Sequence, residues 1–400
     1  MRRALFAVLF CALLVGTQTG AATRPPLTTR LANALAVPNI APETEGALVV
    51  DLATGGTVFD HNGDVSLAPA SNEKLPLTFA ALKVLGAGYR FRTEVLGKGV
   101  LEGTTWRGNL ILKGFGDPTL TTPDLVRLAT QLRRAGIEHV TGRLLGDESW
   151  FDTVRTAPGW KPEFYLSECP PLSALVVDGD WVEDHTALSP ALAATAQFRR
   201  ALRSQGITTG AVGVGKAAPG AAVLATVTSA RLSKVLVDMD LESDNFIAEM
   251  LVKELGVVAG TGGTTAAGAA VVTGALLQAG VPMAGVQFVD GSGLSLDDRT
   301  TAHALAALLA LIWKDPALRT AVTAALPVAG KTGTLKRRLK VKPAFGAVRA
   351  KTGSTDESSA LSGYAGDRYA FSLMQNGDPV AFYWAHLAQD RFAQALARGP

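Results

Sequence analysis

The chain has 400 residues, of which 48% are hydrophobic and 18% are charged, and its formal net charge is +3. A chain of this size and apolar content can bury a large core and has room for two or three domains. Its basic residues are scattered apart from one short cluster at 336–342, which excludes the broad basic stripe of a nucleic-acid-binding surface. We therefore expect a globular protein that has no nucleic-acid partner.

The first 22 residues have the pattern of a secretory signal peptide. Two arginines precede an apolar run at 4–15, and small residues follow as far as Ala21 and Ala22. The run is too short to span a bilayer comfortably, so we expect cleavage after Ala21 or Ala22 rather than a retained anchor. No later segment has the length and apolarity of a membrane span. This pattern predicts an exported protein, periplasmic or extracellular and cell-wall-associated, without a stable membrane anchor.

The spacing of apolar residues and turn residues divides the rest of the chain into elements. The predicted helices lie at 28–37, 71–88, 123–135, 232–255, 264–279, 301–313 and 380–397. Strand patterns occur on either side of a Thr-Gly-Gly turn near residue 55, repeatedly within 88–228, and around a lysine-threonine-glycine tripeptide near residue 351. The segment at 88–228 differs in texture from both of its flanks. We therefore predict one discontinuous domain, 26–87 plus 229–400, interrupted by an inserted domain at 88–228.

Ser71 and Lys74 stand at the beginning of the first strong helical pattern that follows the N-terminal strands. The i, i+3 spacing places both side chains on one helix face, one turn apart. A serine hydroxyl needs an adjacent base to become a nucleophile, and a lysine can supply it when burial or a second cation lowers its pKa. Because S-x-x-K is a weak signal by itself, two unrelated surface residues are the alternative.

Two later motifs could complete such a site. Ser243, Asp244 and Asn245 form an S-x-N pattern early in a helical segment, although a helix cap is by itself the more common reason for these residues. Lys351 and Thr352 precede a glycine that would let a ligand backbone approach an edge strand. Three motifs in this order rarely coincide by chance, so together they favour chemistry.

The motifs resemble the active-site set of class C low-molecular-mass penicillin-binding proteins, the D-Ala-D-Ala carboxypeptidase/endopeptidase family. The resemblance covers nearly the whole mature chain. Further stretches that carry it are PASNEK around Ser71, GFGDPTL at 114–120, APGW at 157–160, PLSALVVDGD at 171–180 and DGSGLS at 290–295. It implies an α+β fold: an antiparallel sheet flanked by helices, of the β-lactamase/transpeptidase type, interrupted by a β-rich insertion.

The resemblance also implies the chemistry of individual residues. Ser71 attacks the carbonyl between the two terminal D-alanines of a peptidoglycan stem peptide. Lys74 takes the serine proton, with its pKa lowered by the like charge of Lys351. Ser243 relays a proton to the leaving D-alanine, while Asn245 holds the substrate amide and Lys74. These roles predict a serine-type D-Ala-D-Ala carboxypeptidase, with cross-link-cleaving endopeptidase activity as a second activity that the motifs do not separate.

Substrate recognition follows from the same resemblance. Lys351, Thr352 and Ser354 bind the terminal carboxylate, and the backbone N–H groups of Ser71 and Ser354 form the oxyanion hole. Asp147 matches an inserted-domain carboxylate that reads the amino group of the stem-peptide side chain, although a turn-forming Asp after a strand explains it equally well. β-Lactam antibiotics are the expected covalent inhibitors.

The tripeptide occurs twice, and the family pattern decides between the copies. Relatives have LPVAG-x-DGTL upstream of the functional strand, and LPVAGKTGTL stands in that place here. Lys331 and Thr332 therefore occupy positions without a catalytic lysine or threonine in the relatives. We predict that Lys351 belongs to the site and that the upstream copy does not.

Three departures from the family pattern limit this transfer. Leu296 stands where relatives usually have an arginine after DGSGLS, which leaves the identity of the stem-peptide diamino acid open. Only VEDHT at 182–186 fills the place of a further nested domain of larger relatives, so we expect that domain to be missing. Pro76 lies two residues after Lys74, where it removes a backbone donor and is expected to distort the helix start.

Two other functions use the same residues. A serine β-lactamase-like hydrolase needs a deacylating base, and the chain has no E-x-x-x-N pattern of the class A type. A non-catalytic peptidoglycan- or β-lactam-binding module has no need of a nucleophile–base pair. The five histidines are isolated and show no paired-ligand spacing, so we expect neither a metal nor a cofactor.

Overall fold

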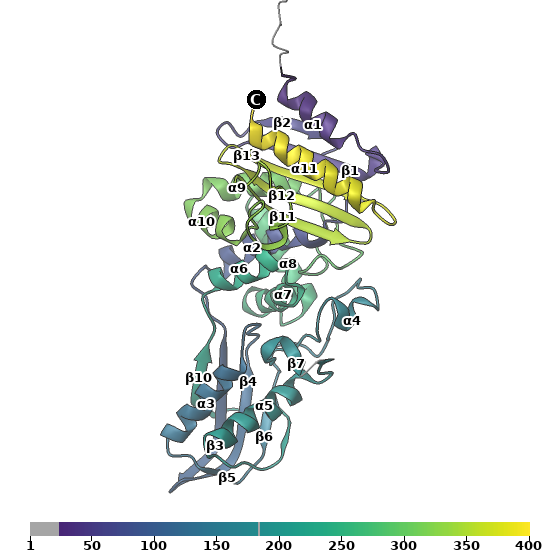
Figure 1. The fold of residues 1–400 in the computed structure, drawn as a ribbon. Coiled ribbons are helices and arrows are strands. Elements are labelled where there is room, and N and C mark those ends of the chain that lie inside the picture. The colour runs from purple at the N-terminus through teal and green to yellow at the C-terminus, as the bar shows by residue number, and fades with distance from the viewer. Residues whose placement is uncertain (1–23, 183–184) are drawn as a thin grey trace, which may run out of the picture.

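The computed structural model describes residues 24–182 and 185–400, so the predicted signal peptide at 1–22 lies outside the described residues. Figure 1 shows two lobes joined at a narrower waist. The upper lobe contains the elements nearest to both chain ends, and the lower lobe is built from the middle of the chain. No described helix combines the length and the apolarity needed to cross a membrane.

The upper lobe is organised around a five-stranded antiparallel sheet of order β11-β12-β13-β1-β2. Its strands are β1 (Glu45–Asp51), β2 (Thr57–His61), β11 (Val348–Thr355), β12 (Ser358–Ala365) and β13 (Tyr369–Asn376). Strand β1 is buried on both faces: alternate residues belong to two different apolar clusters, one beneath α1 and α11 and one beneath α9. Strand β11 is left at the edge, where a ligand can reach it.

Helices cover both faces of this sheet. They are α1 (Leu27–Leu35), α2 (Lys74–Val84), α6 (Leu232–Glu242), α7 (Asn245–Ala259), α8 (Thr265–Gln278), α9 (Ala302–Lys314), α10 (Pro316–Ala325) and α11 (Phe382–Arg398). The single helix predicted at 232–255 is two helices, because Ser243 adopts a left-handed conformation with φ of 62° that ends α6. Helix α10 was not predicted, and the tripeptide near 351 lies within the edge strand β11, where the sequence placed Lys351.

A second, mixed sheet forms the lower lobe, in the order β10-β3-β4-β6-β9, with β5 also paired to β4. Its elements are β3 (Arg92–Glu102), β4 (Thr105–Gly114), α3 (Thr122–Arg134), β5 (His139–Val140), β6 (Leu144–Asp147), α5 (Pro190–Ser204), β9 (Val212–Val214) and β10 (Ala222–Thr228). A capping box of Thr121 and Asp124 starts α3. The lobe has an apolar core of its own, drawn from residues 95–227.

The segment at 148–177 leaves the lower sheet and packs on the upper lobe. It contains α4 (Phe164–Ser167), and the two-stranded ribbon of β7 (Trp181–Val182) and β8 (His185–Thr186) follows it. Phe151 and Leu172 share an apolar cluster with Phe246, Met250 and Leu294 of the upper lobe. The inserted residues therefore contact α7 and the loop at 290–295, both of which border the site.

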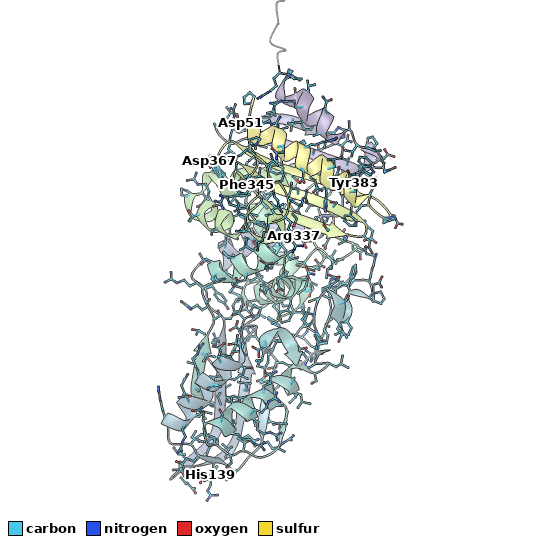
Figure 2. All side chains as sticks on the ribbon, in the orientation of Figure 1. Asp51, His139, Arg337, Phe345, Asp367 and Tyr383 are labelled. Atoms are coloured by element: carbon cyan, nitrogen blue, oxygen red, sulfur yellow. The ribbon has the colours of Figure 1, made fainter. Side chains whose placement is uncertain are left out.

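The packing of α11 generates a test of the upper core. Phe392 is fully buried, with its ring centroid 5.7 Å from that of Phe59 and 6.3 Å from that of Phe371. Replacing Phe392 by Ala should lower the free energy of unfolding by about 3–5 kcal/mol through lost burial and a residual cavity. Tyr383 on the same helix, labelled in Figure 2, is 70% exposed and supplies the control. Tyr383→Ala should change the free energy of unfolding by less than about 0.5 kcal/mol. Urea titration of both variants measures these free energies, and an equal loss in both would contradict this packing.

Candidate active site

Ser71 is held in a short 3-10 turn, η2 (Ala70–Glu73), directly before α2. Ala70 has a φ of 46°, an unfavourable conformation for an alanine, and Gly293 packs so closely that a Cβ there would lie 1.9 Å from the Ala70 carbonyl oxygen. Helix α2 begins at Lys74, so Pro76 falls in its first turn, where a backbone N–H has no partner within the helix. The turn is thus tightened to 3-10 geometry, and the proline is accommodated without a break.

Lys74 is completely buried and is surrounded by three acceptors. Its Nζ lies 2.9 Å from the Ser71 Oγ, 2.8 Å from the Asn245 Oδ1 and 2.7 Å from the Ser292 carbonyl oxygen. The last two acceptors have no hydrogen to give. When Lys74 is neutral, they can take its two N–H bonds, which leaves the nitrogen lone pair directed at the Ser71 hydroxyl.

The S-x-N residues act both as a helix cap and as members of this network. The Asp244 Oδ1 accepts from the Ile247 backbone N at 2.8 Å and caps α7. Asn245, the first residue of α7, binds Lys74 through Oδ1 and donates through Nδ2 to the Glu168 carbonyl oxygen at 3.1 Å. The turn between two helices therefore presents Ser243 and Asn245 to the two lysines.

Lys351 is fully buried on β11, with its Nζ 2.8 Å from the Ser243 Oγ and 2.9 Å from the Thr352 carbonyl oxygen. Strand β11 passes close to the nucleophile, since a Cβ on Gly353 would lie 3.1 Å from the Ser71 backbone N. Ser354 is exposed on the same strand and stands opposite Ser359 of β12. The structure thus brings Lys351 and the backbone of Ser71 close together at the β11 edge of the upper sheet.

The two tripeptide copies have different environments. The Lys331 side chain is exposed, and its Nζ lies 5.3 Å from the centroid of the Phe345 ring, which Figure 2 labels on the upper lobe. Lys351 is the lysine that donates to Ser243. The upstream copy nevertheless contributes one contact, because the Thr352 Oγ1 lies 2.7 Å from the Thr334 Oγ1.

Burial sets the charge state of both lysines. It lowers the pKa of Lys74, against the opposing pull of Asp290 and Glu249. Burial and then the nearby Lys74 ammonium lower the pKa of Lys351 to about 7. Of the two causes expected from the sequence, burial and a second cation, burial is the larger for Lys74, and the like charge of the pair is expressed in the pKa of Lys351.

Two buried carboxyl groups near Lys74, those of Glu73 and Glu249, have raised pKa values. Both Glu73 oxygens are buried without a hydrogen-bond partner among the described residues, and burial raises the pKa of this group well above its usual value. Burial also raises the pKa of Glu249 to about 8. A protonated carboxyl group does little to hold a neighbouring lysine in its charged form, so these residues are compatible with a neutral base.

Asp147 is not brought into this network. It is 1% exposed in the lower lobe, where its carboxylate accepts from the backbone N of Ser149 at 2.9 Å and of Ala217 at 2.8 Å. Burial raises its pKa, but these hydrogen bonds outweigh burial, and the net shift is downward. Asp147 borders a pocket of about 500 Å³ that is also lined by Phe151 and Lys216.

Sequence reasoning missed the groups that hold the base. The loop at 290–295 was noted only as a family stretch, yet its Ser292 carbonyl accepts from Lys74. Glu249 fixes this loop by accepting from the backbone N–H groups of Gly291 at 3.0 Å and Ser292 at 2.8 Å. The spacing from Asn245 to Glu249, i to i+4, places both on one helix face and was a usable signal.

No group of three or more His, Cys, Asp or Glu side chains within 24–182 and 185–400 could hold a metal ion. The site contains a serine hydroxyl, two buried lysine amines and a carboxamide, joined by hydrogen bonds. Together with a helix-flanked antiparallel sheet, these groups define a serine acyl-transfer enzyme of the penicillin-binding class.

Comparison with known proteins gives the family. The model of the D-Ala-D-Ala carboxypeptidase 3 (S13) family matches residues 27–188 and 184–396. A D-alanyl-D-alanine carboxypeptidase of Actinomadura sp. (strain R39) is 34% identical over 417 residues, covering 83% of this chain and 77% of that protein. Carboxypeptidase DacB of Mycolicibacterium smegmatis is 32% identical over 384 residues, covering 88% and 80%. The chain belongs to the S13 family, which confirms the resemblance drawn from the motifs.

A solved structure supports the fold. The crystal structure of penicillin binding protein 4 from Haemophilus influenzae superposes with a TM-score of 0.82, covering 93% of this chain and 98% of that chain, at 23% identity. The predicted α+β fold of β-lactamase/transpeptidase type is thereby confirmed. The activity of the family, serine-type D-Ala-D-Ala carboxypeptidase, is the activity of this chain.

Mutation can distinguish the lysines of the two tripeptide copies, Lys351 and Lys331, because their environments differ. Lys351→Ala should slow acylation by a fluorescent penicillin about 10- to 100-fold, since it removes a charged hydrogen-bond donor from the cleft. Lys331→Ala should label at the wild-type rate, because its side chain is exposed and lies against the Phe345 ring and Gly346, away from Ser71. The reverse pattern of rates would assign the site to the upstream copy.

The lowered pKa of Lys74 predicts the pH dependence of acylation. The base acts when neutral, so the first-order acylation rate at saturating penicillin should rise with pH as Lys74 loses its proton. The rise should level off below pH 10.5, the ordinary pKa of a lysine. Stopped-flow labelling between about pH 6 and about pH 9 measures it. A rate that declines steadily over this range would mean that Lys74 works in its charged form.

Proposed function

We propose that Ser71 is the nucleophile that is acylated during D-Ala-D-Ala carboxypeptidase turnover, with Lys74 as its general base. The main observation behind this proposal is the arrangement around the Lys74 Nζ. Two carbonyl oxygens accept hydrogen bonds from it, and the Ser71 Oγ lies 2.9 Å away. A neutral amine fixed in this way has its lone pair aimed at one hydroxyl proton.

Acylation follows from this geometry. The Ser71 Oγ bonds to the carbonyl carbon of the penultimate D-alanine while its proton passes to the Lys74 Nζ. The tetrahedral oxyanion accepts hydrogen bonds from the backbone N–H groups of Ser71 and Ser354, a role that the close approach of Gly353 to Ser71 supports. Collapse breaks the peptide bond, and the proton that Lys74 took from Ser71 passes by way of the Ser243 hydroxyl to the leaving nitrogen, which returns Lys74 to its neutral form. Ser243 is held for this relay by its hydrogen bond from Lys351. Water then hydrolyses the ester, with Lys74 again as the base.

The terminal carboxylate of the substrate is assigned to Lys351, Thr352 and Ser354. The pKa of Lys351 is about 7 in the empty cleft, so an arriving carboxylate favours its protonated form and compensates for the charge that burial disfavours. Asn245 keeps one N–H free beyond its bond to Glu168, and this N–H can bind the substrate amide. The natural substrate is then a peptidoglycan stem peptide that ends in D-Ala-D-Ala.

Asp147 and the pocket beside it are assigned to the side chain of the stem peptide. The pocket is lined by the carboxylates of Asp147, Glu148 and Asp152 beside the Phe151 ring, and these acidic groups, which outnumber Lys216, suit a chain that ends in an amino group. Residues 26–87 and 229–400 form the catalytic domain and 88–228 the inserted domain, an assignment that the separate apolar core at 95–227 supports. Export through the N-terminal signal would bring the enzyme to this substrate.

β-Lactams are proposed as covalent inhibitors that acylate Ser71. The Haemophilus influenzae penicillin binding protein 4 has been solved in complex with a β-lactam, and that chain shares this fold with a TM-score of 0.77. The absence of an E-x-x-x-N pattern from the sequence argues against a rapid deacylating device of the class A type. A long-lived acyl-enzyme is therefore expected with penicillin.

Replacing Ser71 by Ala tests the assignment directly. The variant should lose D-alanine release from a stem pentapeptide and covalent labelling by penicillin, because Ser71 is the one hydroxyl hydrogen-bonded to Lys74 in the described part of the chain. Wild-type protein should bind one penicillin per chain and turn over nitrocefin slowly. Retained peptide release by a folded Ser71→Ala variant would end this mechanism, and rapid nitrocefin hydrolysis by the wild type would favour a β-lactamase-like enzyme.

A further inference from the structure

The upstream lysine-threonine-glycine copy is joined to the active-site strand. The backbone N of Ala350 donates to the Pro327 carbonyl at 3.0 Å, and the backbone N of Ala329 donates to the Val348 carbonyl at 2.9 Å. The residues that precede the copy thus pair with the open edge of β11. The chain then turns back over the strand as the 3-10 turn η4 (Gly333–Leu335).

The turn η4 is fixed against the end of α6. Gly333 has a φ of 51°, and a Cβ at this position would lie 2.4 Å from the Leu241 carbonyl oxygen. Leu241 lies two residues before Ser243, the hydroxyl that accepts from Lys351. Because both anchors are backbone contacts, Thr334 is held between the end of α6 and the strand that carries Thr352, with its side chain only partly exposed.

The two threonine hydroxyls are close enough to share one hydrogen bond, and either of them can be its donor. The Thr352 Oγ1 lies 2.7 Å from the Thr334 Oγ1. Each hydroxyl has one proton and can rotate, so Thr352 can give its proton to a carboxylate only if it does not donate to Thr334. Thr334 can then rotate and donate to Thr352 in turn, which forms a chain of two hydroxyls that ends on the carboxylate. Such chains strengthen each hydrogen bond in them.

We propose that Thr334 is a positioning residue that orients the Thr352 hydroxyl toward the terminal carboxylate of the substrate. The proposal rests on the assignment of Thr352 to carboxylate binding made above. The segment of the upstream copy then has a role in the site that does not involve its lysine. Lys331 is exposed beside the Phe345 ring, and the hydroxyl that contacts Thr352 belongs to Thr334, the residue after the tripeptide. A valine at 334 keeps the shape of the side chain but can neither accept from Thr352 nor donate to it.

Substitutions at 334 and 352 in the full chain test this role, with release of D-alanine from diacetyl-lysyl-D-Ala-D-Ala as the measurement. Thr334→Val should lower kcat/KM about tenfold, mainly through KM, because the carboxylate loses part of a charge-assisted hydrogen bond. Thr334→Ser should stay within about twofold of wild type, since it restores the hydroxyl. Lys331→Ala, three residues before Thr334 in the same segment, is the matched control and should leave kcat/KM unchanged.

The combination with Thr352→Val separates positioning from a general loss of structure. In the Thr352→Val background, Thr334→Val should have no further effect, because the hydroxyl that it orients is already gone. Three results would overturn the proposal. They are an unchanged kcat/KM for Thr334→Val, a Thr334→Ser variant as slow as Thr334→Val, and a full tenfold loss on adding Thr334→Val to the Thr352→Val background. In those cases the wild type is active and the proposed function stands. A folded wild type that releases no D-alanine would overturn the proposed function and this inference with it.

Discussion

Two buried amines around one hydroxyl constrain the rest of this molecule. Lys74 and Lys351 are both fully inaccessible to solvent, and an isolated charge in such surroundings would be prohibitively costly. Each nitrogen is therefore surrounded by oxygen acceptors, and both pKa values are lowered. Four elements supply these acceptors: the 3-10 turn before α2, the break between α6 and α7, the loop at 290–295 and the edge strand β11.

The insertion is part of this arrangement rather than an appendage. Its segment at 148–177 supplies the Glu168 carbonyl that fixes the Asn245 amide, and its Trp160 donates to the carboxylate of Asp290 at 2.8 Å. Lys161 pairs with Glu357 in the turn that follows β11. One wall of the cleft therefore depends on residues that belong, by sequence, to the middle of the other lobe.

The long periodic segments were the predictable part of the fold. Apolar spacing located α3, α8, α9 and α11, because each buries one stripe or most of its surface. The break at Ser243 was not foreseen: periodicity continues through it, and only a left-handed residue reveals the turn. The same motif carried two interpretations, cap and catalysis. Asp244 caps α7, and its neighbours Ser243 and Asn245 are hydrogen-bonded to the two lysines, as the catalytic proposal requires.

The sequence by itself determined the chemistry available to this protein, because side-chain type and local spacing are written in it: a serine and a lysine one turn apart, a carboxamide, and a second lysine on a strand. Tertiary structure decided which groups hold that chemistry in place. The roles of the Ser292 and Glu168 backbone carbonyls could not be predicted from the sequence, since every residue has a backbone carbonyl. The contact of Thr334 with Thr352 and the exposed position of Lys331 both depend on the packing of η4 against α6. This packing joins segments some ninety residues apart in the sequence.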